Sequence, residues 1–160
     1  MKLFSRNAVD YTHTYGSLIP FLQKNVEADA CILDGELVVV DKKTLAIQPF
    51  GLNKCVAQDK EADMQLCYKV FDLLWLKVEG EEANLMGYPL RERKRLLSQV
   101  VSEEAGKIDV VEFKELEKYD DILIEFNASI ERSEEGIMLK DPDSIYLPKE
   151  RGQNWLKLKG

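Results

Sequence analysis

The 160-residue sequence has few of the residues that build disulfide, zinc or hydrolase sites. Its three cysteines (Cys31, Cys55 and Cys67) are odd in number and form no Cys-x-x-Cys or Cys/His cluster, so a disulfide framework or a zinc centre is excluded. We expect reduced thiols, as in a cytosolic or nuclear protein. The single histidine, His13, has no serine or cysteine partner in a recognisable context, which argues against a hydrolase triad.

Long apolar runs are missing as well. The first residues, MKLFSRN, contain no apolar core of a secretory signal. The apolar stretch Val70–Leu76 is interrupted by Asp72 and is far too short to cross a bilayer. We therefore expect a soluble intracellular protein with no membrane contact.

An excess of positive charge is also lacking. The chain has 22 Lys and Arg against 29 Asp and Glu, a formal net charge of −7. A simple basic DNA-coating module is excluded, because such a protein neutralises phosphates with a positive face. Residues 101–135 hold twelve acidic and four basic side chains, which is typical of a solvated helix face, whereas 136–160 hold five basic and three acidic ones.

The composition and patterning are those of one globular domain, with 45% hydrophobic and 32% charged residues and no linker or repeat. Apolar patterns predict strands at Ala30–Asp41, Gln65–Lys77, Lys107–Phe113, Gly136–Lys140 and Asn154–Lys159. Helices are expected just after Gly16-Ser17, with Pro20 in the first turn, and at Pro89–Val101 and Tyr119–Arg132. Pro89–Val101 is expected to have a basic exposed side made by Arg91, Arg93, Lys94 and Arg95. Strict βαβ alternation is absent, so we predict an α+β fold of mainly antiparallel sheets with flanking helices.

A first chemically informative patch is Asp34-Gly35-Glu36, inside an otherwise apolar segment. Carboxylates at positions i and i+2 of a strand share one face, and bare burial of two charges is costly. Such a pair suits Mg²⁺, which prefers oxygen ligands and keeps several waters. The simpler interpretation is a hairpin turn capped by Asp34, with a bulge as a further possibility.

A second patch runs from Glu135 through Gly136 to Lys140, where a predicted helix gives way to a strand. Glu135 and Lys140 have opposite parity, so they can share a face only if Gly136 bulges or Glu135 lies just before the strand. The alternative is a surface glutamate and a lysine whose stem lies along apolar surface.

A third patch is the terminal Trp155–Lys159 segment. Period-two alternation predicts Leu156 and Leu158 in the core, with Trp155, Lys157 and Lys159 on the other face. Neighbouring lysines repel unless an anion such as phosphate lies between them. The alternative is a solvent-facing edge strand guarded by lysines.

Together the patches offer carboxylates for a metal and lysines for phosphate, the two requirements of phosphoryl or nucleotidyl transfer. No GxxxxGK[ST] loop occurs, so a nucleotide site would be of another type. Five collinear segments resemble motifs Ia, III, IIIa, IV and V of ATP-dependent DNA ligases. They are Ser5–Asn7, Ile32–Glu36, Phe71–Leu74, Glu135–Lys140 and Trp155–Lys159. The stretches Phe4–Thr12 and Asp141–Gly152 resemble the end-joining branch, DNA ligase IV.

The resemblance implies a partial ATP-grasp-like nucleotidyltransferase (adenylation) domain over residues 1–160, with ATP and Mg²⁺ as cofactors. Glu36 and Glu135 would contact the metal, and Glu36 also the nucleotide. Phe71 would stack on adenine, Lys140 would bind nucleotide phosphate, Lys157 and Lys159 would hold the α-phosphate, and Arg6 would contact a sugar or the 5′-phosphate of the nick. The whole protein would seal nicked or broken double-stranded DNA in the nucleus, in break repair by end joining.

Three departures from the family pattern qualify this expectation. No K-x-D-G motif, which carries the family's nucleophilic lysine, occurs in the sequence, and no OB-fold follows motif V. Phe50 stands where ligase IV relatives carry a lysine. The expectation is therefore a ligase fragment that does not self-adenylate and offers no site for the ligase IV accessory partner. The alternatives are a naturally truncated, non-catalytic nucleotide- or partner-binding protein and, less well matched, an RNA ligase or capping enzyme.

Overall fold

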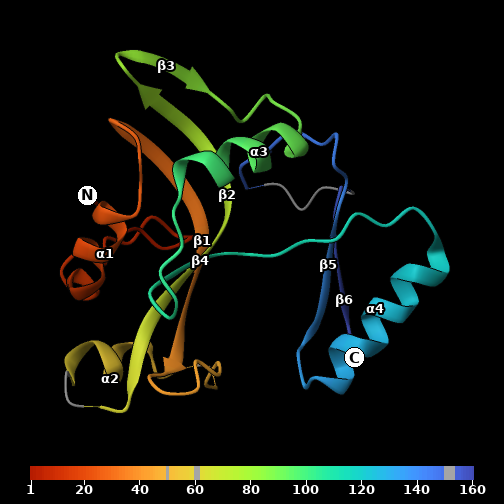
Figure 1. Cartoon of the computed structure of the whole chain (residues 1–160), viewed down its shortest axis with the longest axis horizontal. Helices are drawn as coiled ribbons and strands as arrows, with labels where there is room; N and C mark the ends of the chain where they lie inside the picture. The colour runs from red at the N-terminus through yellow and green to blue at the C-terminus, as the bar shows by residue number, and fades with distance from the viewer. Residues whose placement is uncertain (50, 60–61, 150–153) are drawn as a thin grey trace. The chain divides into compact units, whose positions relative to one another are not determined.

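The structure is a computed structural model that describes residues 1–49, 51–59, 62–149 and 154–160 (Figure 1). Phe50 and the end of the Asp141–Gly152 stretch, both used in the family resemblance, lie outside the described residues. The chain forms two compact units. Unit 1 comprises Met1–Leu85 with Arg93–Val111, and unit 2 comprises Met86–Glu92 with Glu112–Gly160. Both combine helices with mainly antiparallel strands, so the predicted α+β class is confirmed.

The sheet of unit 1 is built on two long paired strands, visible as curved ribbons in Figure 1. Strands β1 (Ala30–Asp41), β2 (Met64–Val78) and β3 (Glu81–Asn84) are antiparallel neighbours, and the short β4 (Ile108–Val110) pairs with β2 in parallel. The two long strands were predicted almost to the residue. The hairpin turn considered at Asp34-Gly35 is wrong, because both residues stay paired with β2 inside one continuous strand.

Two irregularities interrupt the pairing of β1 with β2. The register shifts after Ile32 and again after Asp34, and at each shift β2 holds one extra residue. Those extra residues are Leu74 and Phe71, which have no directly opposite residue in β1. The bulge expected near the Asp34-Gly35 pair therefore exists, but its inserted residue lies on β2. Bulges of this kind bend a strand and redirect its side chains.

Short helices cover one face of this sheet. They are η1 (Gly16–Leu18), α1 (Ile19–Lys24) with Pro20 in its first turn as predicted, and the part of α3 (Leu90–Val100) that belongs to unit 1. Their apolar side chains join those of β2 in a core of Leu18, Leu22, Val70, Leu73, Leu85, Leu97, Val100, Val101 and Ile108. Each such side chain stabilises the fold by about 1.5–3 kcal/mol on burial. A smaller cluster of Val39, Val56 and Leu66 lies beneath α2 (Asn53–Gln58).

The predicted basic exposed side of α3 is only partly right. Arg91 and Arg95 are exposed, but Lys94 is half-buried and Arg93 is fully buried. Arg93 faces inward because its guanidinium pairs with the equally buried carboxylate of Asp72 on β2. Burial also lowers the pKa of Lys94.

Unit 2 consists of α4 (Tyr119–Glu131) and a two-stranded antiparallel sheet of β5 (Gly136–Lys140) and β6 (Trp155–Lys159). All three were predicted within one residue, and α4 packs along β5 (Figure 1). The prediction that Leu156 lies in the core is wrong, since its side chain on β6 is 52% exposed. In the part of the chain that the structure describes, no helix has the length and apolar character of a membrane span.

Candidate functional site

The three predicted phosphate-binding lysines lie on one face of the β5–β6 sheet. Lys157 is directly opposite Met138, Lys159 is opposite Gly136, and Lys140 is opposite Trp155. Directly opposite residues of an antiparallel pair point to the same side, so these positions form one surface, which we call the lysine face. The face predicted from the alternation of Trp155, Lys157 and Lys159 is therefore confirmed and extends to Lys140.

Glu135 lies at the edge of the lysine face. It comes directly before β5, which is one of the two arrangements that the sequence allowed. Its carboxylate Oε2 lies 2.6 Å from Nζ of Lys157 and accepts a hydrogen bond from it. This bond, with the charges of Lys157 and Lys159, holds the pKa of Glu135 below its usual value. The anion expected beside the two lysines is, in this structure, the carboxylate of Glu135.

Gly136 makes this arrangement possible. Its φ of +130° belongs to the region that favours glycine. A Cβ at this position would lie 1.9 Å from the carbonyl oxygen of Leu158. Only glycine lets the backbone of β6 come this close to the start of β5, and that approach brings Lys157 and Lys159 to Glu135.

Lys140 is held by aromatic side chains. Its Nζ lies 3.9 Å from the ring centroid of Trp155, a cation–π contact. The Trp155 ring in turn meets the edge of Tyr146 at a centroid distance of 5.8 Å. The ammonium group of Lys140 is thus placed by an aromatic pair, on the same face as Lys157 and Lys159.

In unit 1, the Asp34-Gly35-Glu36 segment is shaped by Tyr68. A Cβ on Gly35 would lie 2.5 Å from the Lys69 carbonyl oxygen and 2.7 Å from the Tyr68 ring. The ring therefore occupies the space that any other residue would need. Burial, with the charge of Asp34 as a smaller cause, raises the pKa of Tyr68.

Glu36 is exposed on β1, directly opposite Lys69 on β2. Lys69 forms an ion pair with Asp109, with 2.5 Å between Nζ and Oδ2. The Glu36 carboxylate is thus presented to solvent beside a lysine whose charge is already matched. It can accept a cation or hydrogen-bond donors from a ligand.

Phe71 and Arg6 complete the predicted residues of unit 1. Phe71 is half-buried at the second bulge of β2. Arg6 is exposed in a tight turn that is closed by the Ser5 amide, which donates to the Val9 carbonyl at 2.9 Å. The Ser5 hydroxyl accepts two further backbone bonds within the same turn, at 3.3 Å each.

The carboxylates of Glu36 and Glu135 suit a hard cation that takes few protein ligands, and they do not form a closed metal site among the described residues. Within the described ranges, no three His, Cys, Asp or Glu side chains gather where they could hold a metal ion. Glu36 and Glu135 each present an exposed carboxylate, and Mg²⁺ characteristically takes one or two carboxylates with phosphate and water completing its shell. Each carboxylate, taken by itself in its own unit, therefore fits Mg²⁺ that arrives with a nucleotide.

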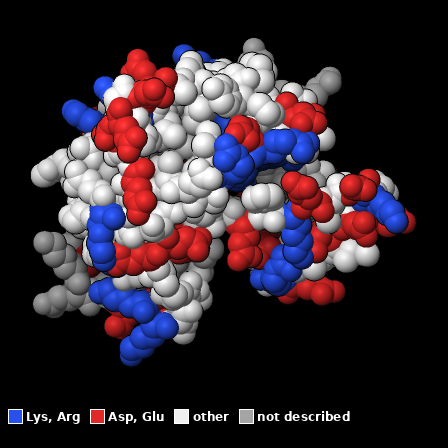
Figure 2. Space-filling view, turned by 45° about the horizontal axis from the view of Figure 1, so that its top comes forward, with Lys and Arg blue, Asp and Glu red and all other residues white. Residues whose placement is uncertain are grey.

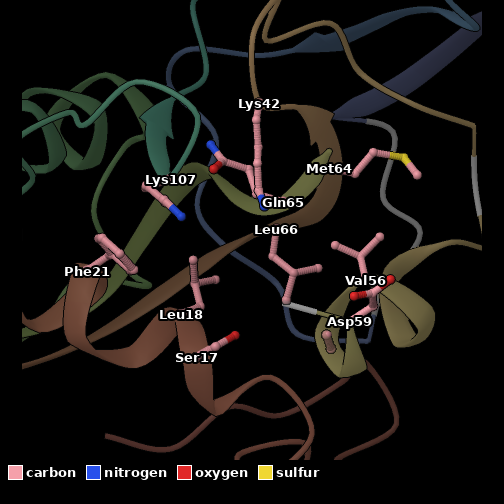
Figure 3. Close-up of a pocket in the computed structure, with 11 residues that line it drawn as sticks. Ser17, Leu18, Phe21, Lys42, Val56, Asp59, Met64, Gln65, Leu66 and Lys107 are labelled. Carbon is pink, nitrogen blue, oxygen red and sulfur yellow. The ribbon is translucent and has the colours of Figure 1, made fainter. Parts of the chain in front are cut away.

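A recess in unit 1 was not anticipated from the sequence. It lies among α1, α2 and β2 (Figure 3) and is lined by Ser17, Leu18, Phe21, Lys42, Val56, Ala57, Asp59, Met64, Gln65, Leu66 and Lys107. None of the predicted site residues is among these. The site predicted from the motifs and this recess are therefore different places in the protein.

The comparison with known families identifies the chain. A family described as "ATP dependent DNA ligase domain" matches residues 1–159. The chain belongs to this family. It is 37% identical to DNA ligase 4 of Homo sapiens and 31% identical to that of Saccharomyces cerevisiae, over 99% of its own length. A DNA ligase of Pyrobaculum calidifontis is 34% identical. The chain spans only 18% of both DNA ligase 4 proteins and 27% of the archaeal ligase.

Solved structures agree with this assignment. The ligase domain from M. tuberculosis LigD superposes with a TM-score of 0.70 at 27% identity, covering 99% of this chain and 46% of that one. A mycobacterial DNA ligase D complexed with ATP and MES gives a TM-score of 0.68 at 26% identity, with 99% and 47% coverage. The predicted membership of the ATP-dependent DNA ligases, with DNA ligase IV as the resembling branch, is confirmed together with the ligase-domain fold.

Arg93 was expected on the exposed side of its helix, but it is fully buried. A signal for it was present, because Asp72 interrupts the apolar run Gln65–Lys77 and a buried carboxylate requires a partner. Arg93 was not recognised as the partner of Asp72 because a helix with several basic residues was expected to expose all of them.

Proposed function

We propose that this chain is the ATP-holding part of a DNA ligase that seals nicked or broken double-stranded DNA through lysyl-AMP and DNA-adenylate intermediates. The observation that carries the proposal is the lysine face, where three ammonium groups and Glu135 stand on one sheet surface. Family membership supports ATP as the nucleotide, and one structural neighbour was solved with ATP bound.

The roles of single residues are those that the resemblance to the ligase motifs implies, and the charge of each side chain agrees with its role. On the lysine face, Lys157 and Lys159 bind the α-phosphate and Lys140 binds a further phosphate oxygen. In unit 1, Phe71 stacks on adenine, Glu36 contacts nucleotide and metal, and Arg6 binds a sugar or the 5′-phosphate of a nick. Mg²⁺, when bound, neutralises phosphate charge. Glu36 in unit 1 and Glu135 in unit 2 are each a carboxylate that, by the family resemblance, would contact it.

Glu135 has a second role, as the resident anion of the lysine face. A phosphate that binds Lys157 replaces the Glu135 carboxylate as its partner and releases that carboxylate for a metal ion. Phosphate binding and metal binding are thereby coupled through one 2.6 Å ion pair. The coupling explains why an acidic residue stands among phosphate-binding lysines.

The cellular setting is proposed from the relatives alone. Several of them are DNA ligase 4 proteins, which supports a nuclear role in DNA break repair by end joining. DNA and ATP are then the partners, with no membrane involved, and we do not expect this chain to bind the accessory partner of ligase IV.

The direct test is calorimetric titration of ATP with Mg²⁺ into the chain and its variants. Lys157→Ala should weaken binding about tenfold or more, because a charge-assisted phosphate contact is worth about 1.5–3 kcal/mol. Lys118→Ala, which removes an exposed lysine from the start of α4, is the matched control and should leave affinity unchanged. Equal affinities of the parent and Lys157→Ala would reject the proposal.

Glu135→Gln separates the two roles of that residue. Without Mg²⁺ the variant should bind ATP more tightly than the parent, because a competing carboxylate has been removed from the lysines. With Mg²⁺ it should bind more weakly, because a metal ligand has been lost. A change of the same sign under both conditions would contradict the coupling.

A further inference from the structure

The carboxylate of Asp72 is fully buried in unit 1 and is bound at both of its oxygens by Arg93. Its Oδ1 lies 2.8 Å from Nε of Arg93 and its Oδ2 lies 3.1 Å from Nη2, a two-point contact. The Leu73 amide also donates to Oδ1 at 2.9 Å. Both charged side chains are 0% exposed.

Stability alone does not account for such a pair. Buried ion pairs often contribute no more than apolar side chains of the same volume, since desolvation offsets their attraction. The unit-1 part of α3 is in any case anchored in the core by Leu97 and Val100, which are 0% and 5% exposed. The best-attested use of a buried pair is to fix one arrangement among several.

The position of Asp72 shows which arrangement is fixed. It lies between the two bulges of β2, directly after Phe71 and two residues before Leu74. A bulged residue has no opposite residue in the partner strand, so its direction depends on how its neighbours in the chain, here Val70 and Asp72, are held. Both neighbours pair with β1, and the carboxylate of Asp72 is in addition bound to Arg93 on α3.

We propose that Arg93 is a positioning residue for nucleotide recognition: by holding Asp72 it fixes the bulge and thus the direction in which Phe71 presents its ring to adenine. The inference rests on the proposed function, in which Phe71 stacks on the base. It adds a residue outside the ligase motifs to the recognition of adenine.

The test compares two ligands, ATP and inorganic triphosphate, which lacks the base. Phe71→Ala should weaken ATP binding about tenfold, the scale of one base–aromatic stack, and leave triphosphate binding unchanged. Arg93→Lys keeps the charge but loses the planar fork. It should weaken ATP at least threefold and also spare triphosphate. Arg95→Lys, an exposed arginine on the same helix, is the matched control and should change neither.

A double variant distinguishes positioning from separate effects. If Arg93 acts through Phe71, Phe71→Ala with Arg93→Lys should bind ATP no more weakly than Phe71→Ala alone. Additive losses, or equal weakening of ATP and triphosphate by Arg93→Lys, would overturn the inference and show a general structural role. Equal ATP binding by the parent and Phe71→Ala would instead contradict the proposed role of Phe71. That result needs no variant of Arg93, so failure of the proposed function can be told apart from failure of this inference.

Folding is checked by circular dichroism and thermal unfolding for every variant. Should Arg93→Lys fail to fold, Asp72→Asn takes its place, because it preserves the shape of the side chain and one acceptor oxygen while removing the charge. The same selective loss of ATP over triphosphate is expected. Unchanged ATP affinity in folded Asp72→Asn would overturn the inference.

Discussion

Single residues of the candidate site divide into those that sequence pattern locates and those that only a tertiary partner explains. Lys157 and Lys159 were placed on one face by strand parity, and the structure confirms the face. Glu135 was left with two possible positions, which the backbone at Gly136 decides. Arg93 was misplaced, because its burial depends on Asp72, 21 positions earlier in the chain.

The ion pair of Glu135 predicts a measurable titration. In the folded protein, the pKa of Glu135 lies below its usual value because of its bond to Lys157 and the charges of Lys157 and Lys159. Its folded pKa is depressed, so the stabilisation by the pair is present at neutral pH and is lost as the pH falls through that depressed value. Lys157→Met should raise the pKa of Glu135 toward its usual range.

Carbon-detected NMR of the Glu135 carboxyl during an acid titration measures this shift. Lys118→Met is the control, since it removes an exposed lysine from the same unit and should leave the Glu135 curve in place. An unchanged curve in Lys157→Met would show that the ion pair does not persist in solution.

Whole elements were predictable where apolar residues run continuously or alternate. Such runs predict the strands Ala30–Asp41 and Met64–Val78. Strand β3 was not predicted, because Glu81–Asn84 is polar and is a strand only through antiparallel pairing with Trp75–Val78. Helix α2 was missed for a similar reason, since six residues with one buried side chain, Val56, carry too weak a pattern.

The pairing of β5 with β6, here called the hairpin, depends on the backbone conformation of Gly136. Gly136→Ala should lower the free energy of unfolding of the hairpin by about 3 kcal/mol or more, from a strained φ of about 1–3 kcal/mol together with a forced displacement of β6. Its new methyl group would otherwise lie 1.9 Å from the Leu158 carbonyl oxygen. Gly87→Ala, in the same unit and with open space around it, should change stability by less than about 1 kcal/mol.

Chemical denaturation in a Trp75→Phe background provides the measurement. The chain has two tryptophans, so Trp155 on β6 then reports on the hairpin alone. Gly136→Ala should also weaken ATP binding, because a displaced β6 moves Lys157 and Lys159 away from Lys140 on the lysine face. Equal unfolding midpoints for the two alanine variants would contradict the role given to Gly136.

At the scale of the whole molecule, charge sets what the chain can do by itself. On the face drawn in Figure 2, acidic and basic side chains lie side by side. With a net charge of −7, the chain lacks the broad positive field that draws proteins to duplex DNA. Nucleotide contacts can be local, as we propose for the lysine face, whereas clamping a duplex requires a much larger surface.

The final prediction is that these 160 residues alone form no covalent adduct with AMP and seal no nick. Adenylation requires an amine aligned with the α-phosphate and partly deprotonated by its surroundings, and no K-x-D-G motif supplies one here. The lysines of the lysine face are poor substitutes. Lys157 donates to Glu135 and the Lys140 ammonium lies over Trp155, so both ammonium groups are already engaged by other side chains.

The measurement is incubation with α-labelled ATP and Mg²⁺, followed by denaturing electrophoresis, with a full-length ATP-dependent DNA ligase as the positive control. The control should retain label and this chain should not. A stoichiometric, acid-labile label on the chain would mean that another lysine attacks the α-phosphate. Lys140→Ala, Lys157→Ala and Lys159→Ala would then identify it, and the assignment of these lysines to binding alone would be wrong.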